Sequence, residues 1–122
     1  MDNKIEHFTD LDVWKVNHQV VLEIYKMIRD FPVSEEYGLT DQIRRASVSI
    51  TNNIAEGWGR YHHADRNRFY YQARESNCEV QNLLIIAHEL RYLSEKDFNQ
   101  LKESVFRGFK VLNGLIHSVK NY

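Results

Sequence analysis

The feature of this sequence that most constrains its fold is a three–four alternation of apolar residues in its second half. Apolar or small residues recur at every third or fourth position from Phe69 to Leu90, and again from Phe98 to Val119. This spacing places them on one face of an α-helix and matches the heptad pattern of helices packed at a shallow angle. Ser94 is the expected cap of the last helix, because the run Ser94–Asp97 resembles a capping box.

The first half of the chain carries two further helical patterns. Residues 10–30 contain two adjacent apolar stripes, so this helix has a wider apolar face than one neighbouring helix would cover. Pro32 should end it, since proline disfavours the α conformation in the residue before it. Thr40 is the expected N-cap of the second helix, whose apolar positions from Ile43 to Ile54 also recur at helical spacing.

These patterns predict an all-α protein, an antiparallel up-and-down four-helix bundle formed by a single domain of residues 1–122. The expected helices cover residues 10–30, 40–58, 64–93 and 95–119. With 122 residues, of which 43% are hydrophobic and 27% charged, the chain has the size and composition of one soluble domain. No stretch approaches the roughly 18–20 apolar residues of a membrane span. The single cysteine, Cys78, suits a reducing compartment, so we expect a cytoplasmic protein with no membrane partner.

The segment from Thr40 to Arg60 contains more polar residues near its apolar seam than an ordinary core helix. A buried polar group without a hydrogen bond costs about 2–7 kcal/mol, so these residues need partners or must face a ligand. We expect a structural polar layer that fixes the register of the helices, as a buried asparagine does in coiled coils. Its predicted members are Ser47, Asn53, Glu56 and Glu79. The alternative is that the carboxylates carry out acid–base chemistry or hold a cation, but no nucleophile or second catalytic element accompanies them.

Three sequence blocks are specific enough to compare with a known family. They are LDVWK at Leu11–Lys15, YGLTDQIRRASVSI at Tyr37–Ile50 and NIAEGWGR at Asn53–Arg60, followed by the pattern Phe69, Ala73, Ser76 and Glu79. With these blocks in this order, residues 8–119 resemble the four-helix-bundle family of 23S rRNA-intervening sequence proteins. The chain differs from the common pattern of that family at Thr51, Asn52, His62 and Tyr70.

The resemblance implies a bacterial protein of uncharacterised function, whose gene lies within an intervening sequence of a large-subunit ribosomal RNA gene or stands alone. It also implies a homo-oligomer, because relatives form ring-like homopentamers. A related branch, the accessory protein of diversity-generating retroelements, binds nucleic acid and a reverse transcriptase. RNA, DNA and a reverse transcriptase or other protein are therefore the partners that the resemblance suggests.

Arginine and aromatic residues alternate between Trp58 and Arg74, although the formal net charge of the chain is only −1. Residues 41–78 contain six basic residues, all arginine, and four acidic residues. Arginine binds phosphate in a bidentate manner, and flat rings stack on unpaired bases. We therefore predict a basic rim that binds RNA or DNA. Its candidate residues are Arg44, Arg45, Arg60, Tyr61, Arg66, Arg68 and Arg74.

An alternative interpretation of the same residues is a protein–protein scaffold without nucleic-acid binding. In it, Phe69 belongs to the core, and Tyr70 and Tyr71 form subunit contacts. The arginines would then pair with the carboxylates of Asp41, Asp65 and Glu75. Aromatic residues make up 12% of the chain, and aromatic residues and arginine are both enriched at protein interfaces.

Neither a catalytic site nor a metal site is predicted. His62, His63 and Asp65 are close in sequence, but adjacent histidines in a loop rarely converge on one ion. Cys78 is expected to be a small packed residue rather than a nucleophile, because no nearby histidine or helix start would activate its thiol. The sequence contains no phosphate-binding loop, dinucleotide fingerprint or nucleophile elbow. We therefore expect a non-enzymatic protein without a cofactor.

Overall fold

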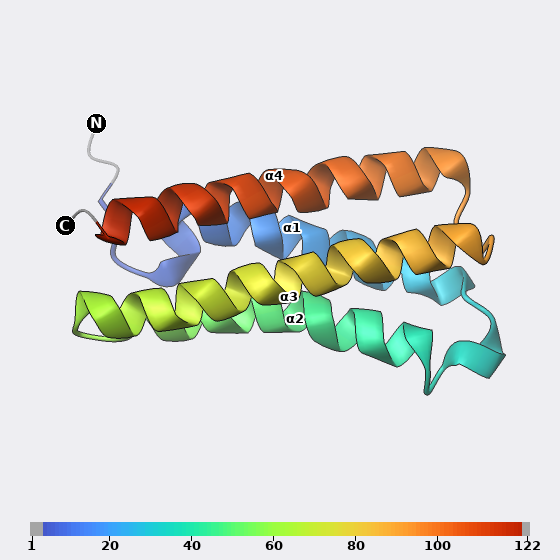
Figure 1. Ribbon diagram of the computed structural model, residues 1–122, viewed down its shortest axis with the longest axis horizontal. Helices are drawn as coiled ribbons and strands as arrows, with labels where there is room; N and C mark the ends of the chain where they lie inside the picture. The colour runs from blue at the N-terminus through green and yellow to red at the C-terminus, as the bar shows by residue number, and fades with distance from the viewer. Residues whose placement is uncertain (1–3, 121–122) are drawn as a thin grey trace.

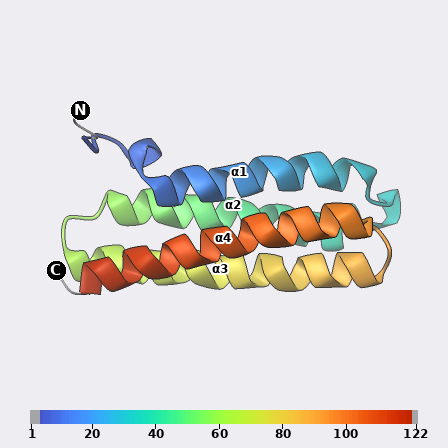
Figure 2. The same cartoon turned by 90° about the horizontal axis from the view of Figure 1, so that it is seen from above.

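Long helices form where the apolar pattern predicts them. The computed structural model describes residues 4–120, and within this range the chain forms four long helices and no strand. These are α1 (Asp12–Met27), α2 (Leu39–Trp58), α3 (His63–Glu89) and α4 (Glu95–Lys120). Each helix runs antiparallel to the one before it, and α4 packs back against α1 (Figures 1 and 2). The prediction of an all-α, antiparallel four-helix bundle is confirmed.

The helical segment that begins with α1 ends before Pro32, as predicted. After α1, helical geometry continues through one 3₁₀ turn, η2 (Ile28–Asp30), and Phe31 is then extended with φ −71° and ψ 150°. Pro32 follows, and its ring disfavours the α conformation at Phe31. Two more 3₁₀ turns flank this helix, η1 (Phe8–Asp10) before it and η3 (Val33–Glu35) on the way to α2.

The start of α2 differs from the sequence prediction. Thr40 is not the N-cap, because the helix begins at Leu39 after Gly38 and Thr40 is buried in the first turn. The carboxylate of Glu35 serves this helix start instead, since its Oε1 accepts a hydrogen bond from the Leu39 N–H at 3.3 Å. Glu35 Oε2 accepts a second hydrogen bond from the Tyr92 hydroxyl at 2.9 Å, and this bond raises the pKa of Tyr92. Glu35 therefore ties the start of α2 to the α3–α4 connection.

The end of α3 also differs from the prediction, because the helix ends at Glu89 rather than at Leu93. Arg91 adopts a left-handed conformation with φ 66°. Its N–H and the following N–H donate to the carbonyl oxygens of His88 and Ala87 at 3.0 and 2.9 Å. This is the Schellman arrangement that ends many helices, usually with glycine at the left-handed position. The apolar pattern continues past this point, so periodicity alone does not reveal the stop.

Replacing Arg91 by glycine is expected to stabilise the protein by about 0.5–1 kcal/mol. Glycine adopts the left-handed conformation without the steric cost of a Cβ atom, although it also loses more backbone entropy on folding. The measurement is the free energy of unfolding in urea. Arg91→Ala is the matched control, because it removes the same exposed side chain but keeps the Cβ atom. Equal stability of the two variants would contradict the prediction.

α4 begins at the predicted cap. The Ser94 Oγ accepts a hydrogen bond from the Asp97 N–H at 3.1 Å, which satisfies one of the free N–H groups at the helix start. From there the apolar face of α4 reaches the centre of the bundle. The apolar residues with 0% exposed surface, within the part of the chain that the structure describes, are Val20, Ile24, Ile43, Ile50, Ile54, Ala73, Val80, Ala87, Val105 and Leu112.

A buried polar network crosses this core between α1, α3 and α4. Asn17 of α1 and Asn77 of α3 are both 0% exposed. Asn77 Nδ2 donates to Asn17 Oδ1 at 3.4 Å and to the Val105 carbonyl oxygen at 3.0 Å, while Gln81 Nε2 donates to Asn77 Oδ1 at 2.8 Å. Asn17 Nδ2 donates to the Gly108 carbonyl oxygen at 3.4 Å. The network fits because Gly108 has no side chain, which lets α4 approach α1 closely.

Candidate nucleic-acid interface

The short connection between α2 and α3 brings arginine and aromatic side chains to one end of the bundle, hereafter the α2–α3 end. α2 closes on Gly59, whose N–H donates to the Ala55 carbonyl oxygen at 3.2 Å. Arg60 and Tyr61 follow in the connection, and α3 then begins at His63. Because α4 runs antiparallel to α3, its last turn reaches the same end (Figure 1).

Two arginines at this end share one aromatic ring. The guanidinium carbons of Arg60 and Arg68 each lie 4.6 Å from the centroid of the Phe69 ring. Phe69 is 7% exposed, so the ring belongs to the protein interior and the two cations lie over it. Arg66 Nε donates to the Arg60 carbonyl oxygen at 2.6 Å, which fixes a third guanidinium beside them. The three side chains are therefore oriented by a ring and by the backbone.

Arg74 extends the basic surface toward α4. Its Nη1 donates to Asn113 Oδ1 at 3.0 Å, and its guanidinium carbon lies 5.2 Å from the centroid of the Tyr71 ring. Lys120 Nζ lies 5.5 Å from the same ring. Sequence reasoning missed Lys120 and Asn113. The antiparallel order of α3 and α4 could have found them, since it places the end of α4 beside the start of α3.

The arginines of this end are not neutralised by contact with any carboxylate that the structure describes. Within residues 4–120, no carboxylate lies within 4.0 Å of the guanidinium nitrogens of Arg60, Arg66, Arg68 or Arg74. The scaffold alternative expects pairing with Asp41, Asp65 and Glu75. Pairs with Asp65 or Glu75 are not found among these residues, whereas Asp41 does pair with Arg44 and Arg45. We call Arg60, Arg66, Arg68 and Arg74 the arginine group.

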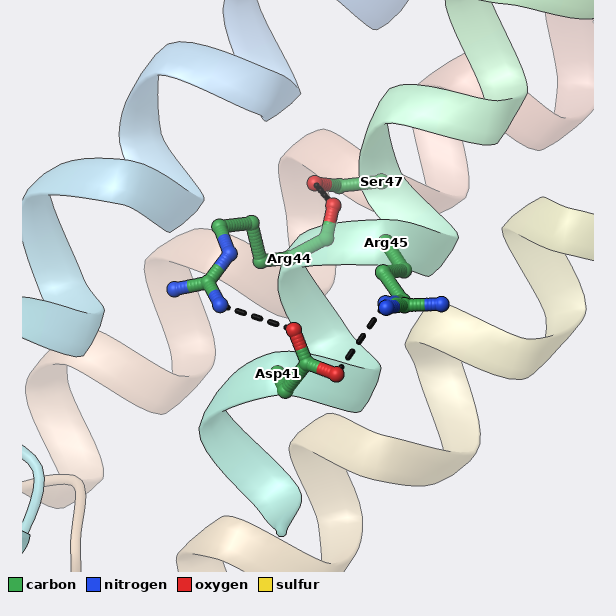
Figure 3. A network of polar contacts seen from close by, with 4 residues as sticks. All are labelled: Asp41, Arg44, Arg45 and Ser47. Carbon is green, nitrogen blue, oxygen red and sulfur yellow. Dashed lines mark hydrogen bonds and ion pairs between the residues drawn. The ribbon is translucent and has the colours of Figure 1, made fainter. Parts of the chain in front are cut away.

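Arg44 and Arg45 do not join the arginine group. They lie in the first turns of α2, about 20 Å along the helix axis from Trp58 at its end. Asp41 holds both of them, with Oδ1 at 2.8 Å from Arg44 Nη2 and Oδ2 at 3.0 Å from Arg45 Nε (Figure 3). The hydrogen bond from Arg44 is the main cause of a lowered pKa of Asp41. The predicted rim is therefore divided between the two ends of the bundle, and its Arg44–Arg45 part is ion-paired.

A family comparison bears on these features. The model of the family described as 23S rRNA-intervening sequence protein matches residues 9–114. The chain belongs to this family. It is also similar in structure to a crystal structure of a protein with unknown function from the S23 ribosomal protein family of Bacteroides thetaiotaomicron, with a TM-score of 0.77 and 20% sequence identity. The match covers 85% of this chain and 97% of that one, and it supports the fold. No curated protein matches the chain.

In this 23S rRNA-intervening sequence family member, the predicted polar layer is only partly buried. Ser47 is 0% exposed and donates to the Arg44 carbonyl oxygen at 2.9 Å (Figure 3). Asn53 is half-buried, and its Nδ2 donates to Ser49 of its own helix. Glu56 and Glu79 are exposed, because each lies one or two positions away from the buried face of its helix. They do not belong to a buried layer of the single chain.

The polar contact between α2 and α3 is made instead by two serines. Ser49 Oγ and Ser76 Oγ lie 2.8 Å apart. The buried layer of this family member is the asparagine network between α1, α3 and α4. The signal for it is Asn17, which lies between Val13 and Val20 on the buried stripe of α1.

Two further residues differ from the expectations. Tyr70 is 2% exposed, and a Cβ atom added at Gly57 would lie 2.6 Å from its ring, so a glycine of α2 makes room for it. Burial raises the pKa of Tyr70 and removes this ring from the surface available to another subunit. Cys78 is exposed rather than packed.

No helix within residues 4–120 has a stretch long and apolar enough to cross a membrane. Within the same range, no three His, Cys, Asp or Glu residues are grouped to hold a metal ion.

Proposed function

We propose that this family member is a non-enzymatic, oligomeric bundle that binds RNA or DNA at its α2–α3 end. The arginine group and Tyr61 form the binding surface. The observation that carries the proposal is that the four guanidiniums are oriented by rings and carbonyl oxygens and have no carboxylate partner in the described chain. Arg44 and Arg45 are left out, because Asp41 pairs with both at the other end.

The chemistry of this surface suits a phosphate backbone. A guanidinium offers two parallel donors to a phosphate, and its orientation before binding reduces the entropy lost on contact. Binding would release counterions from the nucleic acid, so the affinity should fall steeply with salt concentration. A homo-oligomer, a pentamer if it follows the relatives, would present several copies of the surface and raise the avidity without new contacts.

A variant with Arg60, Arg66 and Arg68 all replaced by alanine tests the proposal. It is expected to bind a structured RNA at least about tenfold more weakly than the wild type. The slope of log affinity against log salt concentration should become less negative by about 3, one for each lost phosphate contact. Electrophoretic shift or fluorescence anisotropy over a salt series measures both quantities.

The matched control replaces three exposed arginines at the opposite end of the bundle, Arg29, Arg45 and Arg91, by alanine. It changes the net charge by the same amount but leaves the α2–α3 end intact. Its affinity should stay close to that of the wild type. If both variants lose the same amount of RNA affinity, net charge alone explains the loss and the α2–α3 end is not the binding site. If the wild-type protein does not bind RNA, the proposal is rejected.

The second candidate function is a protein–protein scaffold, favoured by a groove between α3 and α4. The groove has a volume of about 390 Å³ and is lined by Leu84, Ile85, Phe98 and Phe106, among others. Ile85 and Phe106 are 46% and 47% exposed and line the same groove, so they form a shared exposed apolar surface of the kind found at protein interfaces. A loss of oligomeric mass when Ile85 and Phe106 are both replaced by alanine, together with unchanged RNA affinity of the triple arginine variant, would favour this function.

A further inference from the structure

The aromatic rings of the α2–α3 end differ in how much of their surface a ligand could reach. Tyr61 is 88% exposed and makes a T-shaped contact with the His62 ring at 5.1 Å between centroids. Phe69 is 7% exposed under two guanidiniums, and Tyr70 is 2% exposed. Tyr71 lies under Arg74 and Lys120. Of the phenylalanine and tyrosine rings that the structure describes at this end of α3, Tyr61 is the one left open.

The arginines that follow and precede Tyr61 closely in the sequence also lie close to one another. Arg60 and Arg66 are joined by the 2.6 Å hydrogen bond, and Arg60 and Arg68 share the Phe69 ring. From Arg66 to Arg74 the surface extends about 12 Å along α3. Arg44 and Arg45, which would have widened it, lie at the other end of α2. A surface of this length can follow the phosphates of one strand, and the exposed ring of Tyr61, next to Arg60 in the chain, is the feature that favours an unpaired base.

We infer that the α2–α3 end binds a single-stranded segment of RNA or DNA, with one unpaired base stacked on the ring of Tyr61. The phosphates next to that base would lie on guanidiniums of the arginine group. Aromatic stacking accepts any base, whereas a duplex keeps its bases stacked inside and would have to unpair one of them. This inference rests on the proposed function and assigns the strand type and the role of Tyr61 within it.

The experiment compares Tyr61→Ala, Tyr61→Phe and the wild type on three probes. These are a short single-stranded RNA of mixed sequence, the DNA strand of the same sequence, and that DNA strand annealed to its complement. Tyr61→Ala is expected to weaken single-strand binding about 5- to 140-fold, which corresponds to the 1–3 kcal/mol of one base–aromatic stack. Tyr61→Phe keeps the ring and should bind like the wild type, and duplex binding should be weaker than single-strand binding and unchanged by either variant.

Tyr37→Ala is the matched control, because Tyr37 is 91% exposed and precedes α2 at the opposite end of the bundle. It should bind all probes like the wild type, and melting curves of all variants check that the bundle is intact. Binding of either polymer that depends on Tyr61 supports the inference. Duplex binding as tight as single-strand binding overturns it, and so does wild-type affinity of Tyr61→Ala when the triple arginine variant loses affinity. Wild-type protein that binds none of the probes overturns the proposed function itself.

Discussion

A Gly108→Ala variant is expected to lose about 2–4 kcal/mol of free energy of unfolding. A Cβ atom at this position would overlap Asn17 Oδ1 and lie 3.0 Å from Asn17 Cγ. Asn17 is 0% exposed and hydrogen-bonded to Asn77, so its side chain has no free space to move into. The added methyl group must therefore push α4 away from α1 or break the buried hydrogen bonds. Urea unfolding, with the midpoint and slope compared with the wild type, measures the loss.

The same helix offers a matched control for this substitution. Gly114 is exposed, and a Cβ atom there would meet nothing within 4 Å. Gly114→Ala should therefore stabilise the protein by about 0.5–1 kcal/mol, the ordinary gain for alanine in a helix. Shortening Asn17 to alanine in the Gly108→Ala background should recover part of the loss, because the two sites are in contact. A Gly108→Ala variant as stable as the wild type would contradict the close approach of α1 and α4.

The bundle could be predicted from the sequence because apolar spacing alone determines which face of each helix is buried. The asparagine network could not be predicted in the same way. Asn17 and Asn77 occupy positions of the buried stripes, but a search for apolar periodicity passes over polar residues. The partners are also far apart in sequence, and only the packing of α1 against α3 and α4 brings them together. The one feature of the sequence that reflects the close approach of α1 and α4 is Gly108, a glycine within the apolar row of α4.

The candidate interface could be predicted only in outline. The excess of arginine between residues 41 and 78 is a property of composition, and it does not say which side chains share a surface. The length of α2 separates Arg44 and Arg45 from Arg60, and Asp41 pairs with the first two. Lys120 joins the surface through the antiparallel return of α4. These relations depend on helix length and on contacts between helices, so local sequence patterns do not contain them.

An Asn77→Asp variant is expected to be destabilised by about 3–5 kcal/mol at pH 7, because it places an unpaired carboxylate in the core. Asn77 is 0% exposed, and its Nδ2 donates to Asn17 Oδ1 and to the Val105 carbonyl oxygen. An ionised carboxylate has no proton to donate, so it would face these two oxygens directly. A protonated carboxyl has nearly the shape of the amide and could still donate one hydrogen bond.

The stability loss of this variant should therefore depend on pH. Burial raises the pKa of such a carboxyl above its unfolded value of about 3.9, so the folded state binds the proton more tightly. The loss of stability relative to the wild type should be smallest at a pH below about 4. It should grow as the pH rises through the pKa of this carboxyl in the folded protein. Asn82→Asp, at an exposed position of the same helix, is the matched control and should show little loss at any pH. An Asn77→Asp variant whose loss does not change between acidic and neutral pH would mean that water reaches this position, and that the network is not buried.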